Sequence, residues 1–443
     1  MTADFDWQLH PDAEAFVDSI VDAATAQSPR LADFRAELSA RTSTRIQDWL
    51  DHVAAPVTPA QLLAVGYVDG WQSVPGVWRH PGAQLPAMVI ADRYRVALRV
   101  DDAAAALHAL GADRPVLGSP LSAFRSVVVS DDGGTEVVAV ERRSWSAGVT
   151  PVDVSLPQRS AASQAWQVLA ERPRTRVGAS GVAEQLAAAR TAVALVGADL
   201  AASYFLQLER EFWQRSNTAG MLQHARQDRL GLGWGNNDHH TFRSSRAAFH
   251  QTIQFLAALG FQLRERFYAG TEAGWGAQVL EHPGCGGVIF ADVDLTPAEM
   301  EIDFAQTPLV DGTEYGTVGM WCALHGESIL ESGMHHLEGQ FEFDGLRDQL
   351  ADRGVLSMAP FSDFTHLRQA FTEAEVWKVP QERLGRLVAE GQLSAERAGE
   401  IGRDGAAGSH LENLARRAGF KGFNQHNVST TMRATHPRDY RPQ

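Results

Sequence analysis

The chain has 443 residues, 44% of them hydrophobic and 21% charged, a composition typical of a globular protein with a sizeable core. Its 39 Lys and Arg against 54 Asp and Glu give a formal net charge of −15, which disfavours nucleic acid as a partner. With two cysteines outside any CxxC motif, no signal pattern and no segment apolar enough for a bilayer, we expect a soluble cytoplasmic protein without a disulfide framework.

The first half of the sequence alternates between helical and strand-like patterns. Residues 11–53 place apolar side chains at helical spacing, so residues 1–84 are predicted to form an N-terminal helical segment. Residues 85–150 carry short apolar runs typical of strands, with one helix expected over 102–110. Residues 151–230 return to a helical pattern and are interpreted as a helical linker region.

The second half, residues 231–443, is predicted to be the catalytic region. Its first expected elements are a strand at 238–243, a helix near 246–259 and three strands that end near residue 293. A similar passage starts at residue 334, continues through a helix at 346–353 and reaches a strand at 372–377. The charged tail, 380–417, is predicted to be helical, with Ser409 and Glu412 spaced as a capping box.

A strand-helix-strand-strand-strand unit therefore recurs near residues 94–141, 238–293 and 334–377. The repeat is far too long for a solenoid. We predict an α+β fold in which βαβββ modules form a curved sheet or partial barrel around a metal cleft, with added helical segments. Residues 85–150 are expected to form a degenerate βαβββ-like module.

The strand at 238–243 carries the most informative residues of the chain. Side chains alternate faces along a strand, so His239, Thr241 and Arg243 share one face and His240 and Phe242 share the other. The polar character of the first face favours His239 as a metal ligand. Arg243 would bring a guanidinium for an acidic ligand to the same face.

Later strands offer the missing ligands of a metal site. His336 lies on a polar face of its strand and His335 on a mostly apolar one, which favours His336. Glu373 and Glu375 share one face of the strand at 372–377. Two His and one carboxylate from three strands form the facial triad associated with Fe(II) oxygen chemistry.

The run from Asn237 to Arg243 resembles the Asn-Asp-His-x-x-x-Arg opening strand of the 2-oxoadipate dioxygenase/decarboxylase (hydroxyglutarate synthase) family, which belongs to the vicinal oxygen chelate superfamily. The resemblance covers about residues 230–435. Its further matching segments are Leu259-Gly260-Phe261, Tyr268, Leu280-Glu281-His282-Pro283 and 288–295. Near the end, the family's closing pattern is matched by Arg416-Arg417, Gly419-Phe420, Asn424 and Val428-Ser429-Thr430.

This resemblance implies a divalent metal, typically Fe(II), held by two His and one Glu. The corresponding residues are His239, His336 and Glu375. The sequence reads Met-His-His-Leu-Glu where the family more often has Asn-His, so His335 and Glu373 stay open as alternative ligands.

The resemblance also implies a substrate site. Arg243 would hold a substrate carboxylate, and Phe420, Asn424 and Ser429 are expected to contact the substrate. An apolar wall expected to exclude water from the reaction comprises Phe242, Phe290, Trp377 and Phe420.

We therefore expect a non-heme Fe(II) dioxygenase that oxidatively decarboxylates and hydroxylates a 2-oxo acid similar to 2-oxoadipate, or a related amino-acid-derived carboxylate, using O₂. Two other functions stay open. One is a metal-dependent isomerase or lyase that acts through an enolate without O₂, and the other is a non-catalytic binding protein. The expected partners are a small carboxylate and O₂, without nucleic acid or membrane, and the oligomeric state is left undetermined.

Overall fold

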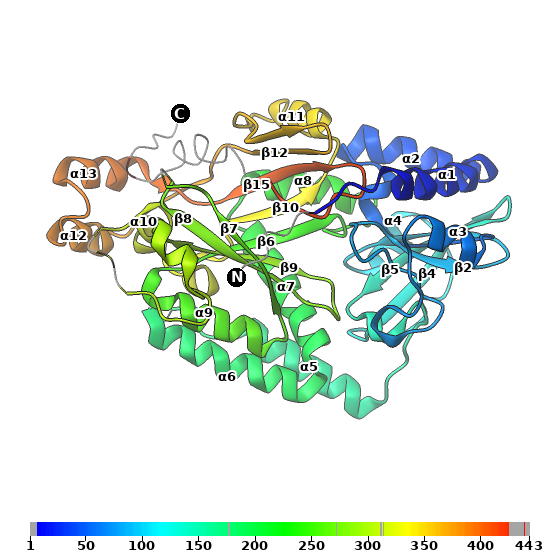
Figure 1. Ribbon diagram of the computed structural model, residues 1–443, viewed down its shortest axis with the longest axis horizontal. Coiled ribbons are helices and arrows are strands. Elements are labelled where there is room, and N and C mark those ends of the chain that lie inside the picture. The colour runs from blue at the N-terminus through cyan, green and yellow to red at the C-terminus, as the bar shows by residue number, and fades with distance from the viewer. Residues whose placement is uncertain are drawn as a thin grey trace.

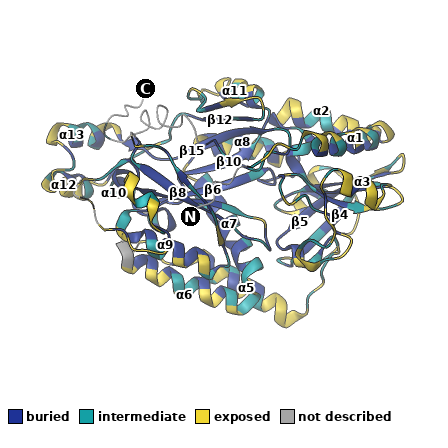
Figure 2. Cartoon of the chain, in the orientation of Figure 1, coloured by how far each residue is buried: buried dark blue, intermediate teal, exposed yellow. Residues whose placement is uncertain are grey.

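Two twisted β-sheets lie side by side in an elongated molecule, the smaller on the right and the larger on the left of Figure 1. The structure is a computed structural model that describes residues 7–175, 178–271, 273–310, 312, 314–424 and 438. Helices enclose both sheets, and the strands are the most deeply buried part of the chain (Figure 2). No helix in these ranges is long and apolar enough to cross a membrane.

The smaller sheet has five strands in the order β2-β1-β3-β5-β4. Their bounds are β1 Leu50–Ala55, β2 Ala87–Ile90, β3 Tyr94–Arg99, β4 Phe124–Asp132 and β5 Thr135–Arg142. At its centre β1 and β3 are antiparallel, and each is flanked by a parallel strand, β2 and β5 respectively. One face packs against α1 (Pro11–Gln27) and α2 (Pro29–Thr42), both of which begin at a proline, whose missing N–H costs nothing there.

Strand β1 lies inside residues 1–84, where the sequence predicted helices throughout. The apolar residues Ile46 and Leu50 have helical spacing, and this spacing led to the helical prediction. In the structure, Val53, Ala54 and Ala55 are all buried because β1 has neighbours on both edges and is covered on both faces. A strand in this position lacks the polar–apolar alternation by which strands are recognised.

The larger sheet has eight strands in the order β11-β12-β15-β10-β6-β9-β8-β7 and curls into a half-barrel (Figure 1). The strand bounds are β6 Asn237–Arg243, β7 Gln262–Tyr268, β8 Trp275–Glu281, β9 Val288–Asp294, β10 His336–Gln340, β11 Ser362–Phe364, β12 Leu367–Phe371 and β15 His410–Arg416. The central antiparallel pair is β6 and β10, and each has its own parallel closing strand, β9 and β15. The predicted α+β fold of βαβββ modules around a curved sheet is confirmed.

The second module of this sheet closes later in the chain than predicted. The expected closing strand at 372–377 is in fact a two-residue strand, β13 (Val376–Trp377), which pairs only with β14 (Ala406–Ala407). Helices α12 (Gln381–Ala389) and α13 (Ala395–Asp404) follow, and only then does β15 enter the sheet. The predicted helical tail is therefore interrupted, and Ser409 and Glu412 lie on or beside a strand rather than at the start of a helix.

Helices cover the convex face of the larger sheet. The main core joins that face to the helices through residues such as Phe242, which stacks on Phe205 at a ring distance of 5.7 Å. The helices that follow one another here are α5 Leu156–Ala170, α6 Gly178–Val196, α7 Ala198–Gln214, α8 Thr218–Asp228 and α9 Arg246–Ala258. The concave face carries both polar side chains and a second apolar cluster that includes Phe267, Phe290 and Phe371.

The segment between α8 and β6, residues 229–236, packs against the end of β3 and so connects the larger sheet to the smaller one. A Cβ atom at Gly235 would lie 2.0 Å from the carbonyl oxygen of Arg99, so this approach requires glycine. The neighbouring Trp234 backbone N–H donates to the Asp101 carboxylate at 2.7 Å. These contacts fix the end of β3 beside the start of β6.

Candidate metal centre

Three potential metal ligands converge on the concave face of the larger sheet. They are His239 on β6, His336 on β10 and Glu412 on β15, and one ligand atom from each lies within 4.8 Å of the others. The pairing of the strands explains the convergence, since His336 is opposite Thr241 across β6 and Glu338 is opposite Glu412 across β15. Because alternate residues of a strand share a face, all three ligands project to the same side.

The donor set fits a divalent metal such as Fe(II). Two imidazoles and one carboxylate are the facial set used for non-heme iron, and they leave coordination positions open. Burial lowers the pKa of both His239 and His336, so both rings are neutral and able to ligate at neutral pH. The Glu412 carboxylate is 2.9 Å from His336 Nε2, and burial raises its pKa, an effect that a bound cation would reverse.

His239 is held by carboxylates behind it. Its Nδ1 atom lies 2.5 Å from Glu338 Oε2 and 3.3 Å from Asp238 Oδ1. Carboxylates in this position fix the orientation of a ligating imidazole. Asp238, His239 and Glu338 also form a second group close enough to hold an ion. Asp238, however, is already engaged by Arg416.

Arg416 balances the charge of Asp238. Its Nε and Nη2 atoms donate to the two carboxylate oxygens at 3.0 and 2.9 Å. Burial alone would raise the pKa of Asp238, but the Arg416 guanidinium more than offsets it and holds that pKa far below its usual range. Gln84 and Gln340 donate to the same carboxylate at 2.8 and 2.9 Å, which completes its hydrogen bonding.

A small cavity of about 50 Å³ lies directly against the three ligands. Most of its wall is aromatic, formed by Phe267, Trp275, Phe290, Phe361, Phe371 and Phe423. The His239 ring lies 4.6 Å from Phe290 and 5.2 Å from Phe423. The centre is therefore shielded from bulk water on the side where a ligand would bind.

Polar atoms in this wall are left for a ligand to satisfy. Gln369 Oε1 and Trp275 Nε1 are buried and have no hydrogen-bond partner among the described residues. The amide nitrogen of Gln369 is already used, since it donates to Glu412 Oε1 at 3.0 Å. One acceptor and one donor thus remain without partners in a cavity whose wall is mainly aromatic, a combination typical of small-molecule sites.

Arg243 lies on the same face of β6 as His239 but does not line the cavity. It is 2% exposed, and its Nε atom has no hydrogen-bond partner and lies 3.9 Å from Asp292 Oδ2. Asp292 does line the cavity, and burial raises its pKa to about 7. The two side chains form a loosely paired unit between the cavity and Trp321, whose ring centre is 5.6 Å from the guanidinium of Arg243.

The structure does not bring Glu375 to the metal centre. Its carboxylate accepts a hydrogen bond from the backbone N–H of Thr218 at 2.8 Å, at the first turn of α8. Glu373 lies two residues away, in the same segment outside the large sheet. The second module closes with β15 instead of residues 372–377, and it is Glu412 on β15 that lies close to His239 and His336.

The remaining predicted residues divide between the cavity and other places. Asn424 and Phe290 line the cavity. Phe420 packs on His366 at 4.8 Å, outside the cavity lining, and His335 lies beside Trp321 at a ring distance of 5.5 Å. Phe242 belongs to the convex core, and Trp377 packs against His325 and Trp321. Ser429 lies outside the described residues.

Glu412 and the lining residues Gln369 and Asp292 escaped the sequence analysis. Gln369 and Glu412 belong to β12 and β15, for which no strand was predicted. Asp292 was within a predicted strand, and its position two residues beyond Phe290 was a usable signal, because residues i and i+2 share a face.

No family model matches the sequence, and no curated protein matches it. Among solved structures, a mutant 4-hydroxymandelate synthase from Streptomyces coelicolor shares 14% identity over 88% of this chain and 98% of its own, with a TM-score of 0.30. Methylmalonyl-CoA epimerase from Mycobacterium tuberculosis shares 14% identity over 41% of this chain and 87% of its own, with a TM-score of 0.23.

A Mn(II)-bound glyoxalase from Novosphingobium aromaticivorans shares 10% identity over 83% of this chain and 82% of its own, with a TM-score of 0.19. All three proteins carry the names of enzymes. At these identities and scores, they carry no argument about the reaction of this chain. The metal centre therefore has to be interpreted from its own geometry.

Proposed function

We propose that the protein is a non-heme Fe(II) dioxygenase that decarboxylates and oxygenates a small 2-oxo acid. The observation that carries the proposal is the buried set of His239, His336 and Glu412 facing a cavity with mainly aromatic walls. Fe(II) bound by this set would keep about three positions open, enough to bind a bidentate 2-oxo acid and to activate O₂.

The residues around His239 hold its imidazole in one orientation. Glu338 and Asp238 face its Nδ1 atom, and Arg416 fixes Asp238 in turn. A proton on Nδ1 would be held between the ring and these carboxylates. This arrangement leaves Nε2 as the ligating atom and increases its basicity.

Arg243 and Asp292 are the proposed contacts for a substrate acid group. With its pKa near 7, Asp292 is partly protonated at neutral pH and can donate to a substrate oxygen. A substrate carboxylate that displaces Asp292 would supply the partner that Arg243 Nε lacks. Trp275 Nε1 and Gln369 Oε1 offer one further donor and one further acceptor, and the phenylalanine wall excludes water.

The proposal is tested with protein loaded anaerobically with Fe(II) and offered a panel of 2-oxo acids of increasing chain length. We expect O₂ consumption and CO₂ release in equal amounts with at least one acid. Glu412→Ala should lose the activity, and Glu375→Ala, the matched glutamate outside the centre, should keep it. Stoichiometric bound iron with no O₂ uptake across the panel would overturn the dioxygenase proposal.

A second function is favoured by Asp292. A carboxyl group with a pKa near 7 beside a metal centre is suited to removing a proton next to a carbonyl, as in a metal-dependent isomerase or lyase. In that case the Mn(II)-loaded protein would exchange substrate C–H for solvent deuterium under nitrogen, and Asp292→Asn would abolish the exchange. Turnover that requires O₂ and shows no such exchange excludes this function.

A further inference from the structure

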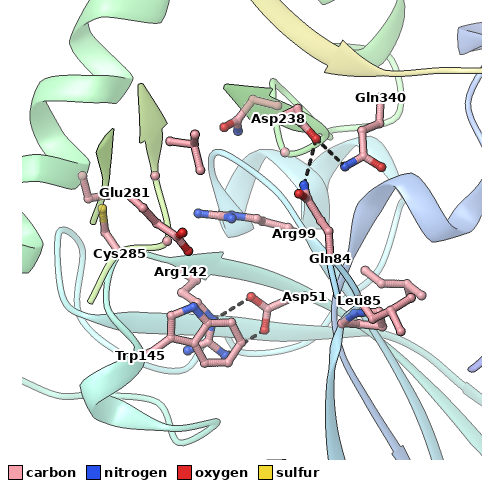
Figure 3. Close-up of a pocket in the computed structure, with 18 of the residues that line it drawn as sticks. Asp51, Gln84, Leu85, Arg99, Arg142, Trp145, Asp238, Glu281, Cys285 and Gln340 are labelled. Carbon is pink, nitrogen blue, oxygen red and sulfur yellow. Dashed lines mark hydrogen bonds and ion pairs between the residues drawn. The ribbon is translucent and has the colours of Figure 1, made fainter. Parts of the chain in front are cut away.

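A second cavity, of about 230 Å³, lies in the cleft between the two sheets, away from the aromatic cavity of the metal centre. Its walls come from β1, β3 and β5 of the smaller sheet, from α7, and from the ends of β6 and β8 in the larger sheet, at Asp238 and Glu281. Figure 3 shows Arg99 in the middle of this cleft, with Asp51 and Arg142 on one side and Asp238 on the other.

The acidic residues of the cleft are already paired with cations. Asp51 accepts two hydrogen bonds from Arg142, at 2.6 and 2.7 Å. Glu281 is paired with Lys421 at 3.2 Å and with Arg264 at 3.4 Å. The other acidic lining residues and their partners are Asp48 with Arg45, Asp101 with Arg210, Glu141 with Arg125 and Asp238 with Arg416. No carboxylate of the cleft is therefore without a cation.

Two guanidinium groups are left over. Arg79 and Arg99 both line the cleft, and neither makes a side-chain hydrogen bond or ion pair with any residue in the described part of the chain. Arg79 lies over the Trp145 ring, with 4.0 Å between its guanidinium carbon and the ring centre. Burial lowers the pKa of Arg79 to about 10, and the positive charges of Arg142 and Arg99 act in the same direction. Arg79 still carries its charge at neutral pH.

Two neutral side chains next to them also lack partners. Trp71 Nε1 and His80 Nδ1 are buried, line the cleft and have no hydrogen-bond partner in the described structure. Buried polar atoms without partners are rare in proteins, and several in one cavity indicate a missing ligand. Two unpaired cations and an indole N–H together fit a ligand with several anionic oxygens.

We propose that this cleft is a binding site for a small dianion, held by Arg79 and Arg99 with a further hydrogen bond from Trp71. A phosphate group and a dicarboxylate share this chemistry. The site is separate from the metal centre and does not depend on the reaction proposed for it. Asp238 is the residue common to the two regions, since it lines the cleft and also lies 3.3 Å from His239 Nδ1.

The test is calorimetric titration of the metal-free full chain with inorganic phosphate and with succinate, at constant ionic strength. We expect saturable binding of at least one dianion, and the tighter of the two identifies the group that the site prefers. Arg79→Gln and Arg99→Gln should each weaken binding by about 10- to 100-fold, the usual cost of losing a charge-assisted hydrogen bond. Arg93→Gln, an exposed arginine paired with Asp131 just before β3, should bind as the unaltered protein does.

Further variants keep the test decisive. His239→Ala should bind the dianion normally, because the metal centre is not involved. Arg79→Lys and Arg99→Lys keep the charge and should recover part of the affinity, which distinguishes loss of the site from loss of folding. The proposal is overturned if neither dianion binds up to roughly 10 mM, far weaker than a built site of this kind allows. It is also overturned if binding is lost in His239→Ala and kept in the Arg79 and Arg99 variants.

Discussion

The two sheets have the same arrangement of central strands but carry different polar side chains. In each, two antiparallel opening strands lie at the centre between two parallel closing strands, β1 and β3 in the smaller sheet and β6 and β10 in the larger. The larger sheet brings together His239, His336 and Glu412. The smaller sheet has the Asp51–Arg142 ion pair, and no metal-binding group is found among its described residues.

Charge balance explains why only one sheet is suited to a metal ion. Asp51 and Arg142 neutralise each other, so the smaller sheet needs no further cation. At the larger centre, Asp238, Glu338 and Glu412 face the single guanidinium of Arg416. Burial raises the pKa of Glu338 and of Glu412, and a divalent cation would offset this effect by stabilising their carboxylate forms.

The difference between the sheets is tested most strongly by removing Glu412. We expect Glu412→Ala to lower the affinity for Fe(II) or Mn(II) by more than about 100-fold, because even residues that only support a metal ligand cost 10- to 100-fold when removed. Metal titration followed by calorimetry measures the effect. Glu375→Ala is the control and should bind metal normally, so the reverse pattern would contradict the assignment of Glu412.

The next largest effect is expected in the smaller sheet, on stability rather than on metal binding. Asp51→Ala leaves the buried guanidinium of Arg142 without its counter-charge and should lower the free energy of unfolding by about 3–5 kcal/mol. Urea denaturation measures this loss, and metal affinity should not change. The double variant Asp51→Leu with Arg142→Met should recover most of the stability. If the single and double variants lose the same free energy of unfolding, the uncompensated charge of Arg142 is not the cause of the loss.

An intermediate effect is expected for Glu338, which supports His239 from behind. Glu338→Gln keeps the shape of the side chain but replaces the carboxyl oxygen that faces Nδ1 at 2.5 Å with an amide group. Metal affinity should fall by about 10- to 100-fold, less than for Glu412→Ala. A loss as large as that of Glu412→Ala would instead make Glu338 a ligand, as the alternative group of Asp238, His239 and Glu338 allows.

The smallest effect is a pH dependence at Asp292. Its pKa is raised to about 7 by burial, so the folded protein binds this proton more tightly than the unfolded chain does. Its contribution to stability is therefore present at low pH and is lost as the pH rises from about 4 to about 7. Asn cannot ionise, so Asp292→Asn should not show this loss of stability. The melting temperature of the variant minus that of the unaltered metal-free protein should therefore increase from about pH 4 to about pH 7, by about 2 °C or more. A difference that does not vary with pH would contradict the raised pKa.

Much of the fold and part of the candidate centre could be predicted from the sequence. The α+β modules followed from short apolar runs and helical spacing, and strand alternation selected His239 and His336, which the structure brings together. Glu412 could not be found in this way. Leu411 and Leu414 have helical spacing, and Ser409 with Glu412 resembles a capping box, although the segment is a strand.

The reason lies in the position of β15. It has neighbours on both edges and every one of its residues is buried, so the local sequence carries no alternation. The place of β15 in the sheet is set by its hydrogen bonding to β10 and β12. Helices α12 and α13 separate β15 from these two strands in the sequence. A local sequence pattern predicts neither the number of residues between these strands and β15 nor the register in which β15 pairs with them.

The place of β15 also orders the events of synthesis and folding. The strand that carries Glu412 is among the last described elements of the chain, yet it inserts between β10 and β12 rather than at an edge of the sheet. While the chain emerges from the ribosome, β10 and β12 must wait with unpaired edges until residue 416 has been made. A nascent or truncated chain that ends before β15 would therefore lack both the strand that joins β10 to β12 and the third ligand of the proposed metal site. The ability to bind metal would then appear only in molecules whose synthesis has passed this strand.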